Sequence, residues 1–138
     1  MRINYILIAE DDEDDQYLLS SAFKEIESGI ELVFVQNGIE LLSHFTRVDE
    51  GKFDLPSLLV VDLNMPKKNG KEAIRELVTK AYFKNFPTII FSTTGNELER
   101  TRCAELGISE YFVKPSNYRT LLQVVSRFQE LAQPLKEI

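Results

Sequence analysis

Apolar and polar positions alternate in blocks along the chain, and the blocks have two different periods. Short apolar runs, many of them rich in β-branched residues, lie at 5–9, 30–35, 57–61, 88–92 and 111–113. Longer segments, in which apolar residues recur every three or four positions, lie at 14–26, 39–48, 73–78, 97–106 and 117–131. The short runs predict five β-strands, and the longer segments predict five α-helices.

The alternation of predicted strands and helices indicates the fold class. The run at 57–61 is apolar on nearly every residue, which is typical of a strand buried on both faces of a parallel sheet. Right-handed crossovers then place helices on both faces of that sheet. Gly29 and Gly107 are stop signals after two of the helices, and Pro134 is one after the last. We predict one α/β domain, 1–138, without an attached effector domain.

Acidic residues are concentrated in one stretch. The chain has 22 acidic and 16 basic residues, a net charge of -6, and residues 10–15 are six acids in succession. The other 16 acids balance the 16 bases. A neutral domain with one negative site lacks the basic patch that nucleic-acid binding needs, so we expect no nucleic-acid partner.

Length and cysteine content narrow the class further. A chain of 138 residues, 43% hydrophobic and 28% charged, is typical of a globular protein with a substantial core. Its single cysteine, Cys103, excludes a disulfide framework. The apolar start of the chain ends at Glu10 and is too short for a signal peptide or a membrane span. We therefore expect a cytoplasmic protein that does not bind a membrane.

Polar residues follow the predicted strands at one edge of the sheet. In open α/β sheets, ligands bind at the carboxyl ends of the strands. The residues there are Glu10 and Asp11, Asp62, Ser92 to Thr94, and Lys114. Carboxylates brought together repel one another, and a hard divalent cation with oxygen ligands, such as Mg²⁺, relieves that repulsion. A lysine and a hydroxyl beside the ion suit a phosphoryl group, which an aspartate can accept as nucleophile.

Four separated motifs carry these residues. They read ILIAEDD at 6–12, VVDLNMP at 60–66 followed by Asn69-Gly70, IFST at 90–93 and YFVKP at 111–115. Together, and over essentially the whole chain, they resemble the receiver domain of two-component response regulators. The resemblance implies a doubly wound, flavodoxin-like (βα)5 domain with a parallel five-stranded sheet of order 2-1-3-4-5.

The resemblance also implies roles for the residues at the strand ends. Asp62 matches the phosphoacceptor of the family. The ligands of Mg²⁺ (or Mn²⁺) match Glu10, Asp11, Asp62 and the backbone carbonyl of Asn64. Lys114 matches the lysine that pairs with phosphoryl oxygens, and the Lys114–Pro115 bond is a candidate cis peptide.

Other matches concern the response to phosphorylation. Ser92 matches the hydroxyl that moves onto the phosphoryl group, with Thr93 beside it, and Tyr111 matches the aromatic that turns inward when the hydroxyl moves. Asn64 and Thr94 occupy the two positions at which the family tunes hydrolysis of the aspartyl phosphate. The plain alternatives are that Ser92 only caps the next helix and that Tyr111 is only sheet core.

The remaining polar residues receive structural interpretations. Glu13 to Asp15 are expected to form a solvated helix start, where the helix dipole favours acids, and Asp12 is expected to cap that helix. His44, the only histidine, is expected on the surface, which excludes a histidine catalyst and a zinc site. Cys103 is expected to pack or to be partly exposed.

The function that the resemblance implies is that of a single-domain response regulator. It would accept a phosphoryl group from a phosphohistidine of a sensor kinase or a histidine phosphotransfer protein, and it would catalyse its own phosphorylation and dephosphorylation without being an enzyme. A conformational switch would then alter the face formed by 97–106, 111–113 and 117–131. We expect a monomer or a phosphorylation-linked homodimer.

Three other functions fit parts of the pattern. A phosphatase of the haloacid dehalogenase type also uses an aspartate after a strand with Mg²⁺, but it needs a second aspartate where this chain has Asn64. A degenerate receiver that accepts no phosphoryl group is disfavoured because every required residue is present. A nucleotide-binding fold needs a glycine-rich loop after the first strand, and the sequence lacks one.

Overall fold

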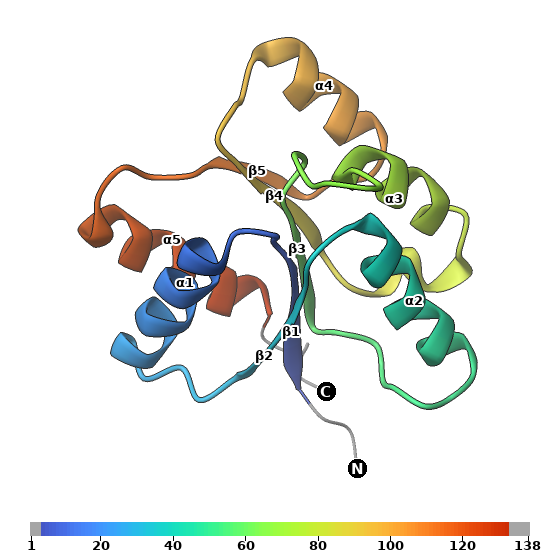
Figure 1. Cartoon of the computed structure of the whole chain (residues 1–138), viewed down its shortest axis with the longest axis horizontal. Coiled ribbons are helices and arrows are strands. Elements are labelled where there is room, and N and C mark those ends of the chain that lie inside the picture. Colours follow the sequence, from blue (N-terminus) through green and yellow to red (C-terminus); the bar gives the residue numbers. More distant parts are fainter. Residues whose placement is uncertain (1–3, 133–138) are drawn as a thin grey trace, which may run out of the picture.

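The computed structural model of the chain describes residues 4–132, in which strands and helices alternate (Figure 1). The strands are β1 (Tyr5–Ala9), β2 (Glu31–Val35), β3 (Leu58–Val61), β4 (Thr88–Ser92) and β5 (Glu110–Val113). The α-helices are α1 (Glu13–Glu25), α2 (Gly38–Asp49), α3 (Gly70–Leu77), α4 (Glu97–Glu105) and α5 (Tyr118–Leu131). A short 3-10 helix, η1 (Ala81–Asn85), precedes β4. Among residues 4–132, no helix combines the length and apolar character needed to cross a bilayer.

The strands form one parallel sheet in the order β2-β1-β3-β4-β5. This confirms the predicted α/β class and strand order. Helices α1 and α5 lie on one face of the sheet, and α2 and α3 lie on the other (Figure 1). Because all strands run in the same direction, their carboxyl ends meet at one edge, where the polar residues that follow them are brought together.

Two apolar cores fill the space between the sheet and the helices. Alternate residues of β1 point to opposite faces, so Ile6 and Ile8 join the core beneath α1 and α5, while Leu7 joins the core beneath α2 and α3. All three side chains are at most 1% exposed. Burial on both faces explains why the strand runs are apolar at nearly every residue. It also makes the sheet a rigid platform for the loops at its carboxyl edge.

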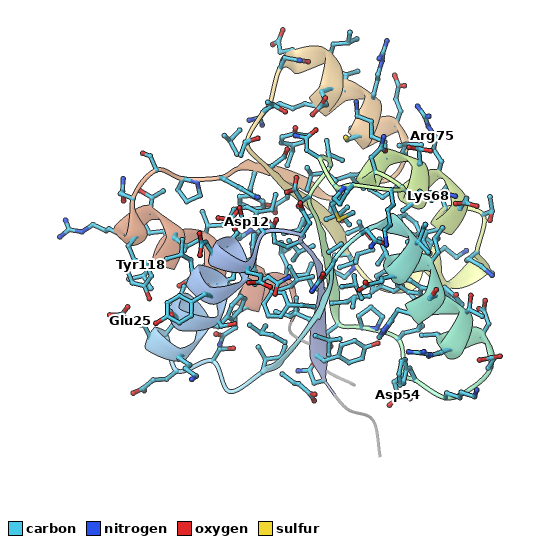
Figure 2. The ribbon with its side chains drawn as sticks, in the orientation of Figure 1. Asp12, Glu25, Asp54, Lys68, Arg75 and Tyr118 are labelled. Atoms are coloured by element: carbon cyan, nitrogen blue, oxygen red, sulfur yellow. The ribbon has the colours of Figure 1, made fainter. Side chains whose placement is uncertain are left out.

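A polar side chain caps the start of each α-helix. In every case its oxygen accepts a hydrogen bond from a backbone N–H two or three residues further on; the caps are Asp12, Asn37, Asn69, Asn96 and Asn117. The prediction that Asp12 caps the first helix is confirmed. Asp12 lies at the start of α1, whereas Asp54 lies at the far end of the molecule, beyond the end of α2 (Figure 2). Since each helix begins after a strand has ended, all five caps help to shape the loops at the carboxyl edge.

The structure differs from the sequence-based prediction in a few places. Helix η1 was not predicted, because the segment before β4 has no helical period; Phe83 anchors it in the core beneath α2 and α3. Leu18 of α1 and Ile39 of α2 fit the apolar period but are 42% and 53% exposed. Pro134, the predicted stop after the last helix, lies outside the described residues.

Candidate functional site

Glu10, the residue after β1, is buried at the carboxyl edge of the sheet. Its side chain is 1% exposed, and its Oε2 accepts a hydrogen bond from the backbone N–H of Asp12 at 3.2 Å. Its backbone is held on both sides, because its N–H donates to the carbonyl of Val35 at 2.9 Å and its carbonyl accepts from Gln16 Nε2 at 2.6 Å. Asp11, the next residue, is exposed. The two acids predicted as metal ligands thus differ in burial, with only Glu10 fixed by the fold.

Asp62, the residue after β3, lies between two hydrogen-bond donors. Its Oδ1 accepts from the backbone N–H of Asn64 at 3.0 Å, and its Oδ2 accepts from Lys114 Nζ at 3.0 Å. Gly70 begins α3 so close to Asp62 that a Cβ at position 70 would stand 2.6 Å from the Asp62 carbonyl oxygen. A side chain there would therefore displace the backbone that carries the carboxylate.

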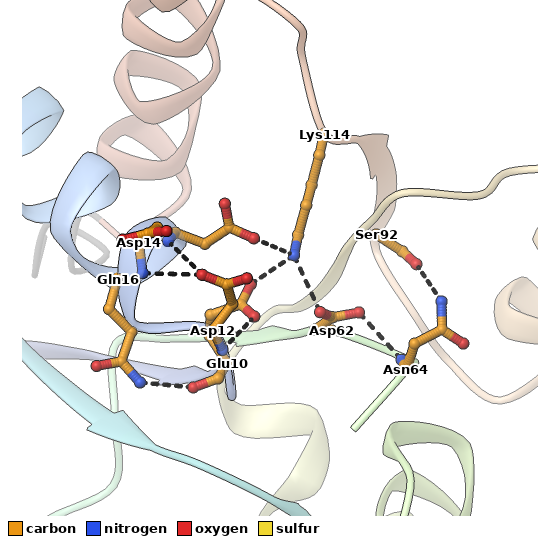
Figure 3. Close-up of polar contacts among 9 residues, drawn as sticks. Glu10, Asp12, Asp14, Gln16, Asp62, Asn64, Ser92 and Lys114 are labelled. Atoms are coloured by element: carbon orange, nitrogen blue, oxygen red, sulfur yellow. Dashed lines mark hydrogen bonds and ion pairs between the residues drawn. The ribbon is translucent and has the colours of Figure 1, made fainter. Parts of the chain in front are cut away.

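Lys114, the residue after β5, places its ammonium group among three carboxylates (Figure 3). Its Nζ lies 2.7 Å from Glu10 Oε1, 2.8 Å from Asp15 Oδ2 and 3.0 Å from Asp62 Oδ2. The backbone N–H of Lys114 donates to the carbonyl of Ser92 at 2.7 Å, which fixes the start of this side chain against β4. Burial lowers the pKa of Lys114, but its contacts with the carboxylates of Asp15, Glu10 and Asp62 outweigh burial and raise that pKa, so the ammonium form persists.

Negative charge exceeds positive charge at this edge. Glu10, Asp11 and Asp62 each offer a carboxylate oxygen, and these oxygens lie within 4.8 Å of one another. Burial raises the pKa of Glu10 to about 7; Lys114 opposes this shift, and the charge of Asp62 adds to it. Glu10 Oε1 accepts no well-aligned hydrogen bond, and its contact with Lys114 is an ion pair. A buried, incompletely satisfied carboxylate among other acids is a donor set that fits a hard divalent cation.

Ser92 and Asn64 face each other across the site. Ser92 ends β4 with no exposed surface, and Asn64 Nδ2 donates to its hydroxyl over a long 3.5 Å (Figure 3). Ser92 does not cap α4, because Asn96 does. Thr93 and Thr94 follow Ser92 and are both exposed. The buried hydroxyl therefore lies at the strand end, as predicted, and two exposed threonines follow it.

Tyr111 connects β5 to the start of α4. Its hydroxyl lies within hydrogen-bond distance of both the carbonyl of Thr94 and Glu99 Oε1, the latter at 2.7 Å. Glu99 also pairs with Lys71 of α3 at 3.2 Å, and the guanidinium of Arg100 lies 4.9 Å from the centre of the Tyr111 ring. The alternative that Tyr111 is only sheet core is wrong, since its polar end joins the loop after β4 to α4.

Two predictions about this edge need correction. Residues 4–132 contain no cis peptide bond, so the Lys114–Pro115 bond is trans; trans is the intrinsic preference of such bonds, and Lys114 reaches its carboxylates without the cis form. Asp15, assigned to a solvated helix start, instead pairs with Lys114. The helical period could have indicated this contact. Asp15 lies one turn before the buried Leu19, on the side of α1 that faces the core.

His44 also differs from its prediction as a surface residue. It is 7% exposed, and its Nε2 lies 2.9 Å from the hydroxyl of Tyr5. In α2 it stands between the buried residues Leu41 and Phe45, so the helical period places it on the buried side. Burial lowers the pKa of His44, with a smaller contribution from Arg47. Cys103 was expected either to pack or to be partly exposed, and it packs, at 2% exposed.

Comparison with known proteins agrees with this geometry. The response regulator receiver domain matches residues 6–126 of the chain. The chain belongs to this family. Response regulator Rcp1 of Synechocystis sp. is 28% identical over 123 residues, which cover 87% of this chain and 82% of Rcp1. The sensor histidine kinase CheAY of Helicobacter pylori is 32% identical over 125 residues, which cover 90% of this chain but 15% of CheAY.

Solved receiver structures have the same fold. The phosphorylated cyanobacterial phytochrome response regulator RcpA is 28% identical and aligns with a TM-score of 0.82 over 93% of this chain and 92% of RcpA. The Mn²⁺-bound form of Rcp1 aligns with a TM-score of 0.82 over 98% of both chains, at 24% identity. The receiver fold of this chain is thus established by the alignment as well as by the sheet order.

Proposed function

We propose that this receiver domain accepts a phosphoryl group on Asp62 in a two-component pathway. The observation that carries the proposal is the position of the Asp62 carboxylate, which is 8% exposed and lies 3.0 Å from Lys114 Nζ. Glu10 and Asp11 offer oxygens beside it. The donor would be a phosphohistidine of a sensor kinase or a histidine phosphotransfer protein.

In the proposed transfer, a carboxylate oxygen of Asp62 attacks the phosphorus atom. A P–O bond forms and the P–N bond breaks; its electron pair goes to the imidazole nitrogen, which takes up a proton. The Lys114 ammonium and the Ser92 hydroxyl bind phosphoryl oxygens, whose negative charge grows during the transfer. A divalent cation held by Glu10, Asp11, Asp62 and the carbonyl of Asn64 would supply further positive charge to those oxygens.

The proposed output is a change on the face formed by α4, β5 and α5. When Ser92 moves onto the phosphoryl group, the loop after β4 moves with it, and this loop already contacts Tyr111 through the carbonyl of Thr94. Leu98 of α4 and Val113 of β5 are both exposed, at 61% and 42%. The face therefore offers apolar surface for a target protein or a second copy of the chain. The proposed place of action is the cytoplasm. Asn64 and Thr94 flank Asp62 and Ser92 and would tune the lifetime of the phosphorylated form.

Intact mass measurement tests this proposal. Wild type and Asp62→Asn are incubated with acetyl phosphate and Mg²⁺, with Asp14→Asn as the matched control because Asp14 is exposed and carries the same charge. We expect wild type and Asp14→Asn to gain one phosphoryl group, and Asp62→Asn to gain none. The proposal fails if wild type gains none in Mg²⁺, or if Asp62→Asn gains as much as wild type.

A further inference from the structure

The Lys114 ammonium is already surrounded by carboxylates at the place where a phosphoryl group would bind it. An ammonium carries three N–H donors, and Glu10, Asp15 and Asp62 lie 2.7, 2.8 and 3.0 Å from Nζ. Two of the N–H groups donate to Asp15 and Asp62, and Glu10 lies beside the ammonium as an ion pair. A phosphoryl oxygen that binds Nζ therefore competes with these carboxylates, and the one that is held least firmly gives way. The identity of that carboxylate determines how easily the phosphorylated state forms.

Two of the carboxylates are held by the fold. The side chains of Glu10 and Asp62 are 1% and 8% exposed. Each also accepts a hydrogen bond from a backbone N–H, that of Asp12 for Glu10 and that of Asn64 for Asp62. Moving either one away from Lys114 would leave buried charge without a partner, which is strongly unfavourable.

Asp15 is different, because solvent can replace its partner. Its side chain is 33% exposed. Within residues 4–132, Lys114 is the one hydrogen-bonding partner of its carboxylate. Asp14, one residue earlier, lies in the same first turn of α1, so the favourable interaction of an acid with the helix start does not explain the contact of Asp15 with Lys114.

We propose that Asp15 occupies the place on Lys114 that a phosphoryl oxygen takes, and thereby disfavours the phosphorylated state. The inference rests on the proposed function of Asp62. A phosphoryl group adds about −1.5 to −2 charges at neutral pH. Once it binds Lys114, Asp15 loses its ion pair and faces that negative charge. Asp15 thus competes with the phosphoryl group for Lys114.

Beryllofluoride binding tests this inference without phosphoryl turnover. This anion takes the place of a phosphoryl group on a carboxylate, and calorimetric titration in Mg²⁺ measures its affinity. We expect Asp15→Asn to bind it about three- to tenfold more tightly than wild type, the effect of one partly exposed ion pair together with relief of repulsion. Asp14→Asn removes the same charge from the same helix turn and should change the affinity by about twofold or less. Asp15→Glu keeps the carboxylate and should bind close to wild type.

The outcomes separate this inference from the proposed function. Wild type that binds beryllofluoride while Asp15→Asn binds equally or more weakly overturns the role of Asp15 alone. Equal gains in Asp15→Asn and Asp14→Asn overturn it as well, because the effect would then be one of overall charge. Wild type that neither binds beryllofluoride nor gains a phosphoryl group from acetyl phosphate overturns the function of Asp62, and the role of Asp15 with it.

Discussion

Strand β1 has a buried polar cluster at each end, and the two clusters are built differently. At its carboxyl end, Lys114 lies among Glu10, Asp15 and Asp62. At its amino end, the hydroxyl of Tyr5 donates to the carbonyl of Asp54 at 2.5 Å and lies 2.9 Å from Nε2 of His44. The second cluster borders a cavity of about 700 Å³ between β2 and α2, a size that by itself would suit a ligand.

Shifted pKa values do not distinguish the two clusters. Burial raises the pKa of Tyr5 to about 12 and lowers that of His44, just as burial raises the pKa of Glu10 to about 7. Charge balance does distinguish them. Tyr5 and His44 are uncharged at neutral pH and satisfy each other, whereas Lys114 cannot neutralise the carboxylates around it. The comparison teaches that a buried cluster with uncompensated charge is the one that requires an external cation.

Removal of the Lys114 ammonium is expected to have the largest effect on stability. Lys114→Met leaves Glu10 and Asp62 buried without a counter-charge, so we expect the free energy of unfolding at pH 8, without divalent cations, to fall by about 3 kcal/mol or more. Lys114 lowers the pKa of Glu10, so in Lys114→Met that pKa lies above its wild-type value of about 7. Glu10 of the variant therefore takes up its proton at higher pH, and part of the loss should return at pH 6. Urea unfolding at both pH values measures the change.

Lys84→Met is the matched control, because Lys84 is exposed and its removal should change stability little. If Lys114→Met unfolds like this control at pH 8, the charge of Lys114 does not stabilise the cluster at the carboxyl end of β1. The proposed difference between the two ends of β1 is then wrong.

Metal binding is expected to give the next largest effect. Mg²⁺ at a hundredfold excess over its dissociation constant should stabilise wild type by about 2.7 kcal/mol, by mass action on the folded state. Asp11→Asn removes an exposed carboxylate that we propose as a ligand and should lose most of this gain. Tyr5→Phe, altered at the other end of β1, should keep all of it. Thermal unfolding with and without Mg²⁺ measures the gain. A full Mg²⁺ response in Asp11→Asn would show that the ion binds elsewhere.

The smallest expected effect concerns pH at the amino end. The folded-state pKa of His44 lies below its ordinary value of 6.5. Below pH 6.5, His44 therefore binds a proton more readily in the unfolded chain than in the folded chain. The stability that neutral His44 contributes is therefore complete above pH 6.5 and decreases as the pH falls toward the folded-state pKa, by at most about 1.4 kcal/mol per pH unit.

In His44→Gln this pH dependence is absent. The stability difference between wild type and His44→Gln should accordingly shrink between pH 7.5 and pH 5.5 in urea unfolding, and Mg²⁺ should not alter it. A difference that stays constant over this range would mean that His44 takes up its proton equally in the folded and unfolded states.

The sequence predicted the elements and the strand ends well, because both depend on local pattern. Periodicity located the strands and helices to within a few residues, and Glu10, Asp62, Ser92 and Lys114 all lie where the strand ends were expected. The strand order followed from the resemblance, since periodicity alone does not say which strands pair.

What the sequence analysis missed were contacts between distant segments. Asp15 and Lys114 are 99 residues apart in the chain, and the hydroxyl of Tyr5 meets His44 across 39 residues. Residue type suggested exposure for both Asp15 and His44, and only the packing of α1 and α2 against the sheet brings them to buried partners. The helical period was the better guide in both cases, because each residue lies on the side of its helix that faces the core.

The central claim is that Asp62, and no other carboxylate at this edge, accepts the phosphoryl group. Borohydride reduces an acyl phosphate to an alcohol, so treatment after incubation with acetyl phosphate and Mg²⁺ converts a phosphorylated aspartate into homoserine. Peptide mass analysis then identifies the position. We predict homoserine at position 62 alone, and none when Mg²⁺ is chelated. Reduction at Glu10, Asp11 or Asp15, or at no position, would contradict the account.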